Sequence, residues 1–125
     1  MAKILVVDDE TLLRTILSDA LESAGHTVTV AEDGKSALAV ARDDPPDCIL
    51  LDIMMPGLDG YQTCEALKAD PAMGRIPVLL VSATTDLRVV DRAEKVGASG
   101  VLPTPVPPEE LQHAVALALA TPPSV

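Results

Sequence analysis

The sequence predicts an α/β domain in which a parallel sheet is covered by helices on both faces. Short apolar runs rich in Val, Ile and Leu alternate five times with longer segments whose apolar residues recur at helical spacing. Most of these runs are apolar throughout, as expected of strands that are buried on both faces of a sheet. The chain has 125 residues, and we expect five β-then-α units in one domain that covers residues 1–120.

The predicted strands are short and end in polar residues or turns. The first is a β-branched run that stops at Asp8, and the third is an apolar run that stops at a carboxylate, Asp52. The second strand alternates threonine with valine. We expect strands at Lys3–Val7, Thr27–Ala31, Cys48–Asp52, Val78–Val81 and Gly100–Leu102.

The segments that follow the strands carry helix-capping signals. We expect Thr11, Asp33 and Asp86 to cap the first, second and fourth helices. Gly25 and Gly97 stand where the C-terminus of a helix favours glycine. The expected helices cover residues 11–24, 34–42, 60–69, 86–96 and 109–120, and their expected buried positions include Leu12, Ile16 and Leu17 in the first helix and Val89, Val90 and Ala93 in the fourth.

The composition limits the functional classes. The net charge is −10, from 19 acidic and 9 basic residues, which argues against direct nucleic-acid binding by this domain. No apolar run approaches the ~20 residues of a membrane span, and the N-terminal segment lacks a signal-peptide pattern. We therefore expect a cytoplasmic protein without membrane contact, in which Cys48 and Cys64 are reduced thiols in the core. Residues 121–125 are expected to be a tail or the start of a linker.

Polar side chains stand at the carboxyl ends of four predicted strands. Asp8 and Asp9 follow the first strand, Asp52 ends the third, Ser82 follows the fourth and Thr104 lies after the fifth. These ends share one edge of a parallel sheet, where open α/β sheets place their ligand sites. Three carboxylates that converge repel one another and favour a cation, and oxygen ligands with room for water suit Mg²⁺. A carboxylate in such a site can attack a phosphoryl donor and form an aspartyl-phosphate.

Three motifs make the sequence resemble the receiver domains of two-component response regulators, a family that includes single-domain chemotaxis regulators. They are VVDDE at 6–10, LLDIMMPGLDG at 50–60 and VSA at 81–83. The resemblance implies a flavodoxin-like, doubly wound (βα)5 three-layer sandwich with the strand order 2-1-3-4-5. It also implies a signalling domain rather than an enzyme, with at most self-phosphorylation and self-dephosphorylation.

The same resemblance implies roles for individual residues. Asp52 would be the phosphoacceptor, and Ser82 would be the hydroxyl of the switch. The side chains of Asp9 and Asp52 would bind Mg²⁺ or Mn²⁺, together with the backbone carbonyl of Met54. Asp8 would act on the same ion through water.

The resemblance further implies tuning positions and partners. Met54 and Thr84 match the positions that set the lifetime of the phosphate in this family. The expected phosphodonor is a sensor histidine kinase or a histidine phosphotransfer protein, and the expected target is an output domain or a downstream protein. Family habit also suggests a homodimer through the fourth and fifth helices.

Two positions depart from the family pattern. Thr104 replaces the usual lysine that holds the phosphate, and Val101 replaces an aromatic residue that often reports phosphorylation. Two unit charges ~4 Å apart interact by roughly 4 kcal/mol at an effective dielectric near 20, so the loss of that lysine matters. We expect Arg14 or Arg88 to compensate in part. Pro105 retains the family's proline, and we expect a cis Thr104–Pro105 peptide.

Two other function classes remain open. The first is a pseudo-receiver, an interaction module that works without phosphate; Thr104 and Val101 favour it, whereas the intact acids argue against it. The second is an enzyme or cofactor carrier on the same architecture. A flavodoxin would need a hydroxyl-rich phosphate loop and flanking aromatic residues, and an aspartyl-phosphate hydrolase would need a cap domain and a catalytic lysine. The sequence lacks these features.

Overall fold

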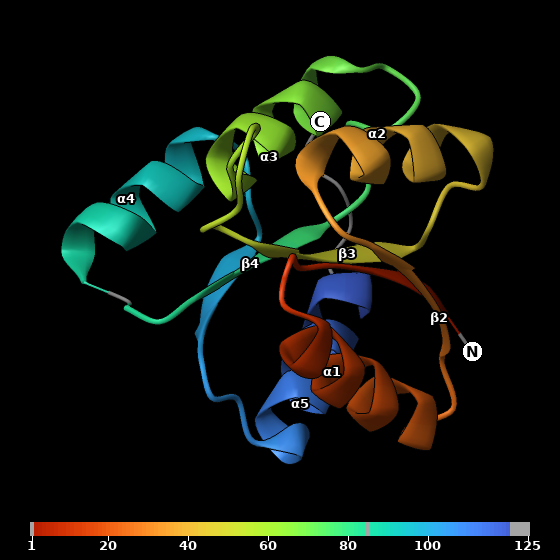
Figure 1. Ribbon diagram of the computed structural model, residues 1–125. Coiled ribbons are helices and arrows are strands. Elements are labelled where there is room, and N and C mark those ends of the chain that lie inside the picture. The colour runs from red at the N-terminus through yellow and green to blue at the C-terminus, as the bar shows by residue number, and fades with distance from the viewer. Residues whose placement is uncertain (1, 85, 121–125) are drawn as a thin grey trace.

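The computed structural model describes residues 2–84 and 86–120, and in them strands and helices alternate five times (Figure 1). The elements are β1 (Lys3–Val7), α1 (Thr11–Ser23), β2 (Thr27–Ala31), α2 (Gly34–Asp43), β3 (Cys48–Asp52), α3 (Gly60–Ala69), β4 (Val78–Ser82), α4 (Leu87–Lys95), β5 (Gly100–Pro103) and α5 (Pro108–Ala120). The predicted alternation is confirmed, and each predicted strand differs from the observed one by at most one residue. The tail expected at residues 121–125 lies outside the described residues.

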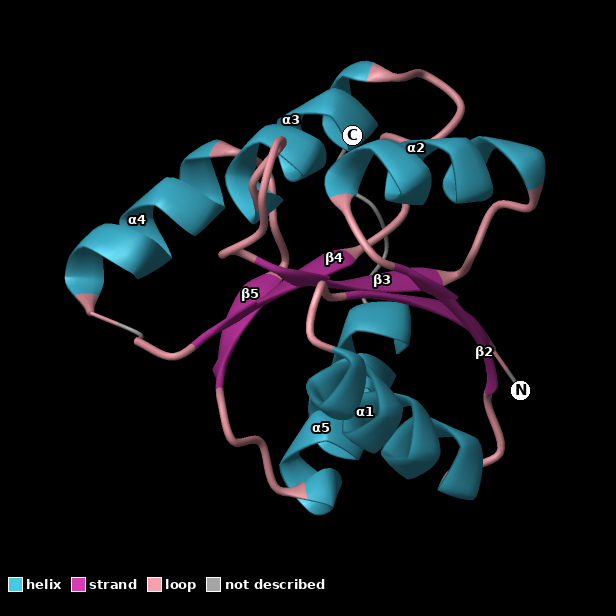
Figure 2. Ribbon diagram, in the orientation of Figure 1, coloured by secondary structure: helices cyan, strands magenta, loops and turns pink. Residues whose placement is uncertain are grey.

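All neighbouring strands in the described sheet are parallel, and their order is β2-β1-β3-β4-β5. Helices α1 and α5 cover one face of the sheet, and α2, α3 and α4 cover the other, as Figure 2 shows. The doubly wound three-layer fold is therefore confirmed. Because the strands run in the same direction, their carboxyl ends lie along one edge of the sheet.

The strands hold the three layers together because successive side chains point to opposite faces. Leu5 and Val7 of β1 pack into the core beneath α2, α3 and α4. Ile4 and Val6 pack into the second core beneath α1 and α5. All four side chains are buried, and each contributes about 1.5–3 kcal/mol relative to an exposed side chain. A strand anchored on both faces has little freedom to shift, so its last residue is held firmly at the sheet edge.

Two expectations about helix faces are wrong. Leu12 and Ile16 were expected inside but are 73% and 52% exposed, because α1 presents only the Leu17–Leu21 side to the core. Val90 was also expected inside but is 42% exposed, since α4 buries Ala93 instead. In both helices the apolar residues extend around more of the surface than the neighbouring elements cover.

The capping signals were correct for most helices. Asp33 accepts a hydrogen bond from the backbone N–H of Ser36, and Asp86 accepts from those of Arg88 and Val89. The first helix differs: its N-cap is Glu10 rather than Thr11, and the Glu10 side chain makes no capping bond. Gly25 and Gly97 have φ values of +94° and +88°, which the helix C-termini require and which glycine adopts readily.

The two cysteines carry free thiols in the described core, as expected. Burial raises the pKa of Cys48 to about 12 and that of Cys64 to about 11. Both side chains are therefore neutral at physiological pH and behave as small apolar residues. No helix in the described part of the chain has the length and apolarity that a membrane crossing requires.

Candidate functional site

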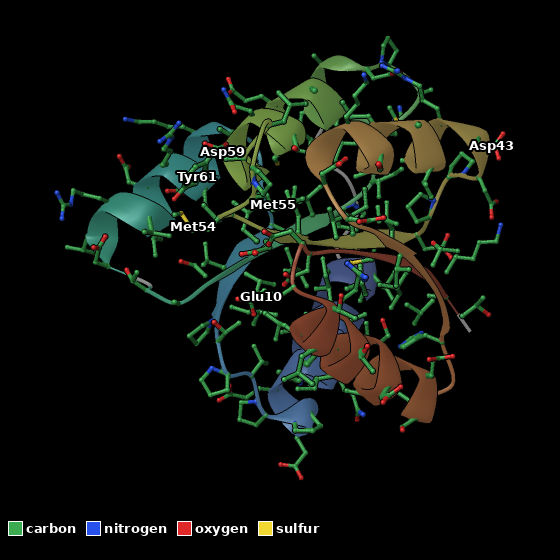
Figure 3. The ribbon with its side chains drawn as sticks, viewed as in Figure 1. Glu10, Asp43, Met54, Met55, Asp59 and Tyr61 are labelled. Carbon is green, nitrogen blue, oxygen red and sulfur yellow. The ribbon has the colours of Figure 1, made fainter. Side chains whose placement is uncertain are left out.

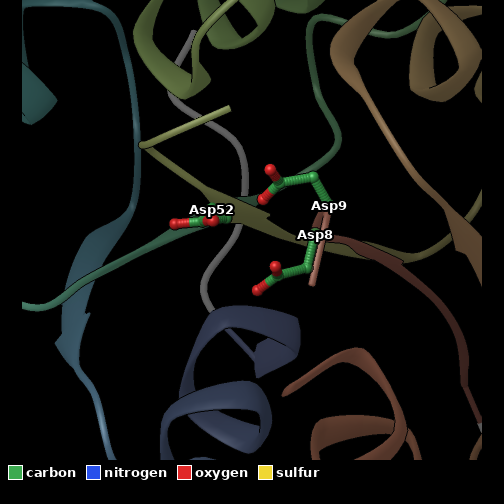
Figure 4. A group of neighbouring side chains, drawn as sticks. All are labelled: Asp8, Asp9 and Asp52. Carbon is green, nitrogen blue, oxygen red and sulfur yellow. The ribbon is translucent and has the colours of Figure 1, made fainter. Parts of the chain in front are cut away.

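Three carboxylates meet at the carboxyl edge of the sheet. Asp8 and Asp9 follow β1, and Asp52 is the last residue of its neighbour β3. One oxygen from each side chain lies within 4.8 Å of the others, and Figure 4 shows all three carboxylates turned toward one region. The convergence predicted from strand order is thus present in the structure.

Asp8 is the most constrained of the three acids. Its side chain is fully buried, and Oδ1 accepts a hydrogen bond from the backbone N–H of Glu10 at 2.8 Å. Its backbone carbonyl accepts a bond of 2.8 Å from Nη1 of Arg14. Within the described residues, Asp8 Oδ2 is the one buried side-chain oxygen or nitrogen atom with no hydrogen-bond partner.

A buried carboxylate oxygen without a hydrogen-bond partner costs folding free energy, so its presence indicates a site for a ligand such as a cation or water. It is accompanied by the exposed Asp9 and the half-buried Asp52, so the donors are all oxygens and one side of the site is open to water. Oxygen ligands with space for water suit Mg²⁺ or Mn²⁺. The residues present therefore fit the divalent cation that the sequence led us to expect.

The raised pKa values of two of the acids also favour a bound cation. Burial, and next the neighbouring Asp8 carboxylate, raise the pKa of Asp52 from 3.8 to about 7. The backbone N–H of Met54 donates to Asp52 Oδ1 at 3.3 Å and acts in the opposite direction. Burial also raises the pKa of Asp8, and the charge of Asp9 adds to this effect. A bound cation would offset the repulsion and favour the ionised acids.

Hydroxyl groups complete the edge beyond Asp52. Ser82 ends β4 and is buried, and its Oγ accepts the backbone N–H of Thr84 at 3.2 Å. A hydroxyl that accepts one bond keeps its own proton for donation. Thr104 follows β5, and its backbone N–H donates to the carbonyl of Ser82 at 2.9 Å. The Thr104–Pro105 peptide is cis. Thr104, which stands where the family has a lysine, thus lies next to Ser82 but has an uncharged side chain.

The loop after Asp52 is held against the strand by a glycine. A Cβ at Gly60 would lie 2.5 Å from the carbonyl oxygen of Asp52 and 2.6 Å from Cα of Ile53. The N–H of Gly60 also donates to the Ile53 carbonyl at 2.9 Å. We expected Gly60 only to begin a helix, yet it is the residue that lets α3 approach the backbone of Asp52. The capping box of Asp59 and Gln62 marks the start of α3 in the sequence, but it does not indicate this close approach.

The two arginines expected near the acids differ in position. Arg14 is partly buried, donates to the Asp8 carbonyl, and lowers the pKa of Asp8 through its charge. Arg88 has a side chain that is 95% exposed, and its partner is Asp86 on the same helix turn. Lys3 pairs with Asp44, far from the carboxyl edge of the sheet. Arg14 is therefore the better placed of the two arginines to offset negative charge at the acids.

Residues 4–116 match the family described as the response regulator receiver domain. This chain belongs to that family. The match runs from β1 into α5 and includes all three acids. Receiver domains are signalling domains rather than enzymes of the ordinary kind.

Individual relatives and solved structures agree with this assignment. Protein PilH of Pseudomonas aeruginosa is 39% identical over 122 residues, which cover 96% of this receiver and 99% of PilH. The response regulator PleD of Caulobacter vibrioides is 43% identical over 105 residues, which cover 84% of this receiver and 23% of PleD. The chemotaxis protein CheY4 of Vibrio cholerae superposes with a TM-score of 0.91 at 33% identity, covering 94% of this receiver and 98% of that chain.

The receiver spans 23% of the length of PleD and less than half the length of two further curated relatives, the probable transcriptional regulators ycf27 of Guillardia theta and Porphyridium aerugineum. What those longer proteins do as a whole is therefore not transferred to this chain.

Proposed function

We propose that this receiver accepts a phosphoryl group on Asp52 and thereby switches its interactions with other proteins. The observation that carries the proposal is the cluster of three carboxylates in which Asp8 Oδ2 is buried and unpartnered. Asp52 is the member at the end of a central strand, in contact with solvent on one side, where a donor can approach. Membership of the receiver family supports the same role.

In the proposed reaction an oxygen of Asp52 attacks the phosphorus of a phosphohistidine. The new bond joins the carboxylate oxygen to phosphorus, the phosphorus–nitrogen bond breaks, and the released imidazole takes up a proton. The product is an aspartyl-phosphate, and attack by water on phosphorus returns the carboxylate and inorganic phosphate. The backbone N–H of Met54 would orient the attacking carboxylate, and the Ser82 hydroxyl, whose oxygen accepts the Thr84 N–H, would donate its proton to a phosphoryl oxygen.

Asp9, Asp52 and the backbone carbonyl of Met54 would hold Mg²⁺ or Mn²⁺, with Asp8 acting through water. When bound, the ion would neutralise charge on the acids and on the transferred group. The proposed domain is residues 1–120. Met54 and Thr84, which are exposed beside the site, would tune how long the phosphate survives.

A second candidate function is an interaction module that needs no phosphate. It is favoured by Thr104, an uncharged residue beside Ser82 at the position of the family's lysine, and by Val101, at the position of an aromatic residue on β5. Arg14 argues against it in part, because its guanidinium supplies positive charge at Asp8.

The proposed partners follow from the proposed chemistry. The donor is a sensor histidine kinase or a histidine phosphotransfer protein, and the recipient of the signal is an output domain or a downstream protein. We propose no direct contact with nucleic acid or membrane, a cytoplasmic location, and at most self-phosphorylation and self-dephosphorylation as activity. A homodimer through α4 and α5 stays a prediction.

Amide NMR on the ¹⁵N-labelled chain tests the proposal. Mg²⁺ and beryllofluoride, a phosphoryl mimic, are added to the wild type and to Asp52→Ala. We expect shifts at Asp9, Met54 and Ser82 that require both additives and are absent from the variant. A wild type that binds neither additive would contradict phosphoacceptance and support the second candidate.

A further inference from the structure

A contact between an arginine and a tyrosine ring joins α4 to the start of α3. The guanidinium carbon of Arg92 lies 4.2 Å from the centroid of the Tyr61 ring. Tyr61 is the only aromatic residue in the sequence, and its side chain is 7% exposed. A guanidinium over an aromatic face at this distance is a cation–π interaction, which gains strength when the ring is shielded from water. Figure 3 labels Tyr61 beside Asp59, on the side of the molecule where α4 lies.

Tyr61 is also linked to Asp52 through the residue that precedes it, Gly60. Its neighbour Gly60 lies so near the backbone that a Cβ there would be 2.5 Å from the Asp52 carbonyl oxygen. The Gly60 N–H is bonded to the Ile53 carbonyl at 2.9 Å. The first residue of α3 therefore contacts the backbone of Asp52 and Ile53, so a displacement of that backbone would act directly on the start of α3. Tyr61 is the next residue in the sequence, so it would move together with Gly60.

Helix α4 packs mainly on β5, and it has a second contact with α3. Ala93 is its buried residue and Val96, its C-cap, is also buried, whereas Leu87 and Val90 are exposed. The carbonyl of Val96 accepts a hydrogen bond of 3.4 Å from the thiol of Cys64, which is another residue of α3. Helix α4 is thus held to α3 near both its middle and its end, and α3 begins at the Asp52 backbone.

We propose that the Arg92–Tyr61 contact couples the occupancy of Asp52 to the position of α4 and hence to its exposed surface. The inference rests on the proposed function, because it assumes that Asp52 changes state. It supplies a route from the acid site to the surface that does not pass through the valine on β5. Packed interfaces with alternative arrangements are the usual carriers of such coupling.

The test follows α4 separately from the acid site. Amide shifts caused by Mg²⁺ and beryllofluoride are recorded for the wild type, Arg92→Gln, Lys95→Gln and Tyr61→Phe. Lys95 is the matched control, since it is a cation on the same helix whose side chain is 75% exposed and pairs with Asp91. Tyr61→Phe keeps the aromatic face and removes only the hydroxyl group.

We expect Arg92→Gln to keep the shifts at Asp9 and Asp52 and to lose those across α4. The control and Tyr61→Phe should respond as the wild type does. By the reciprocity of coupling, Arg92→Gln should also change the half-saturating beryllofluoride concentration by about two- to fivefold, the factor expected for a partly exposed cation–π contact.

Three results would overturn the inference. If Arg92→Gln kept the amide shifts in α4 and the affinity for beryllofluoride, the contact would be purely structural. Loss of the α4 response in Tyr61→Phe would assign the coupling to the hydroxyl instead of the ring face. A wild type with no Asp52-dependent shift at all would overturn the proposed function together with this inference, and that outcome is distinct from a selective failure at α4.

Discussion

Replacing Asp52 by asparagine should stabilise the fold at alkaline pH and not at acid pH. The side chain keeps its size and its acceptor for the Met54 N–H, but the negative charge beside Asp8 and Asp9 is removed. The pKa of Asp52 is raised from 3.8 to about 7 by burial and by Asp8. Between these two pH values the folded chain holds a proton that the unfolded chain has released. The free energy of unfolding therefore falls as pH rises from about 4 to 7, and the penalty is complete above 7.

The size of the effect follows from the same two pKa values. Each pH unit between them is equivalent to about 1.4 kcal/mol, so the upper limit is about 4 kcal/mol. Solvent reaches part of Asp52 and screens the repulsion, so we expect about 1–2 kcal/mol at pH 8. For a domain of this size that corresponds to a rise in Tm of about 3–8 °C.

Thermal unfolding followed by circular dichroism at pH 4.5 and pH 8, with a chelator present, measures this difference. The matched control is Asp19→Asn, which removes one exposed charge from α1 and leaves the acid cluster unchanged. Added Mg²⁺ should stabilise the wild type at pH 8 and reduce the advantage of Asp52→Asn. The reasoning fails if Asp52→Asn gains no more at pH 8 than at pH 4.5, or no more than the control.

Three further predictions concern the surroundings of the site. Gly60→Ala places a methyl group against the Asp52 carbonyl oxygen and should cost about 1–3 kcal/mol in urea unfolding, whereas an unchanged midpoint would argue against the close approach. Asp59→Ala removes the capping box with Gln62 and should cost about 1 kcal/mol by the same assay, with Asp59→Asn retaining most of the stability. Thr104→Lys restores a cation at the end of β5 and should tighten beryllofluoride binding in the presence of Mg²⁺ by roughly tenfold, the worth of a charged hydrogen bond; calorimetry showing equal affinity would contradict this.

The strands and the topology could be predicted because their signals are local. Apolar runs ending at Val7 and Asp52 define the strands, and strict alternation leaves few arrangements for a parallel sheet. The faces of α1 and α4 could not be predicted as well, because apolar residues such as Ile16 and Val90 extend past the contact surface. How much of a helix is covered depends on its neighbours, which periodicity does not describe. The N-cap of α1 was predicted at Thr11 but is Glu10, whose backbone N–H donates to the Asp8 side chain.

The site was predictable only in its outline. Parallel strands bring Asp8 and Asp52 to one edge, and that much follows from chain direction. The burial of Asp8 beside the exposed Asp9 depends on the turn between β1 and α1, which the sequence does not specify. The contact of Arg92 with Tyr61 depends on how α3 and α4 pack beside each other on one face of the sheet. Such relations between distant segments require the folded arrangement.

The burial of Cys48 and Cys64 makes the native chain convenient for site-specific labelling. Maleimide reagents react with accessible thiolates, and these two sulfurs are neither accessible nor ionised near neutral pH. A cysteine introduced at Leu87, which is 86% exposed at the beginning of α4, would then be the selective attachment point for a fluorophore or spin label in an otherwise unaltered chain. The motion of α4 can thus be followed in real time without first removing a cysteine from the core.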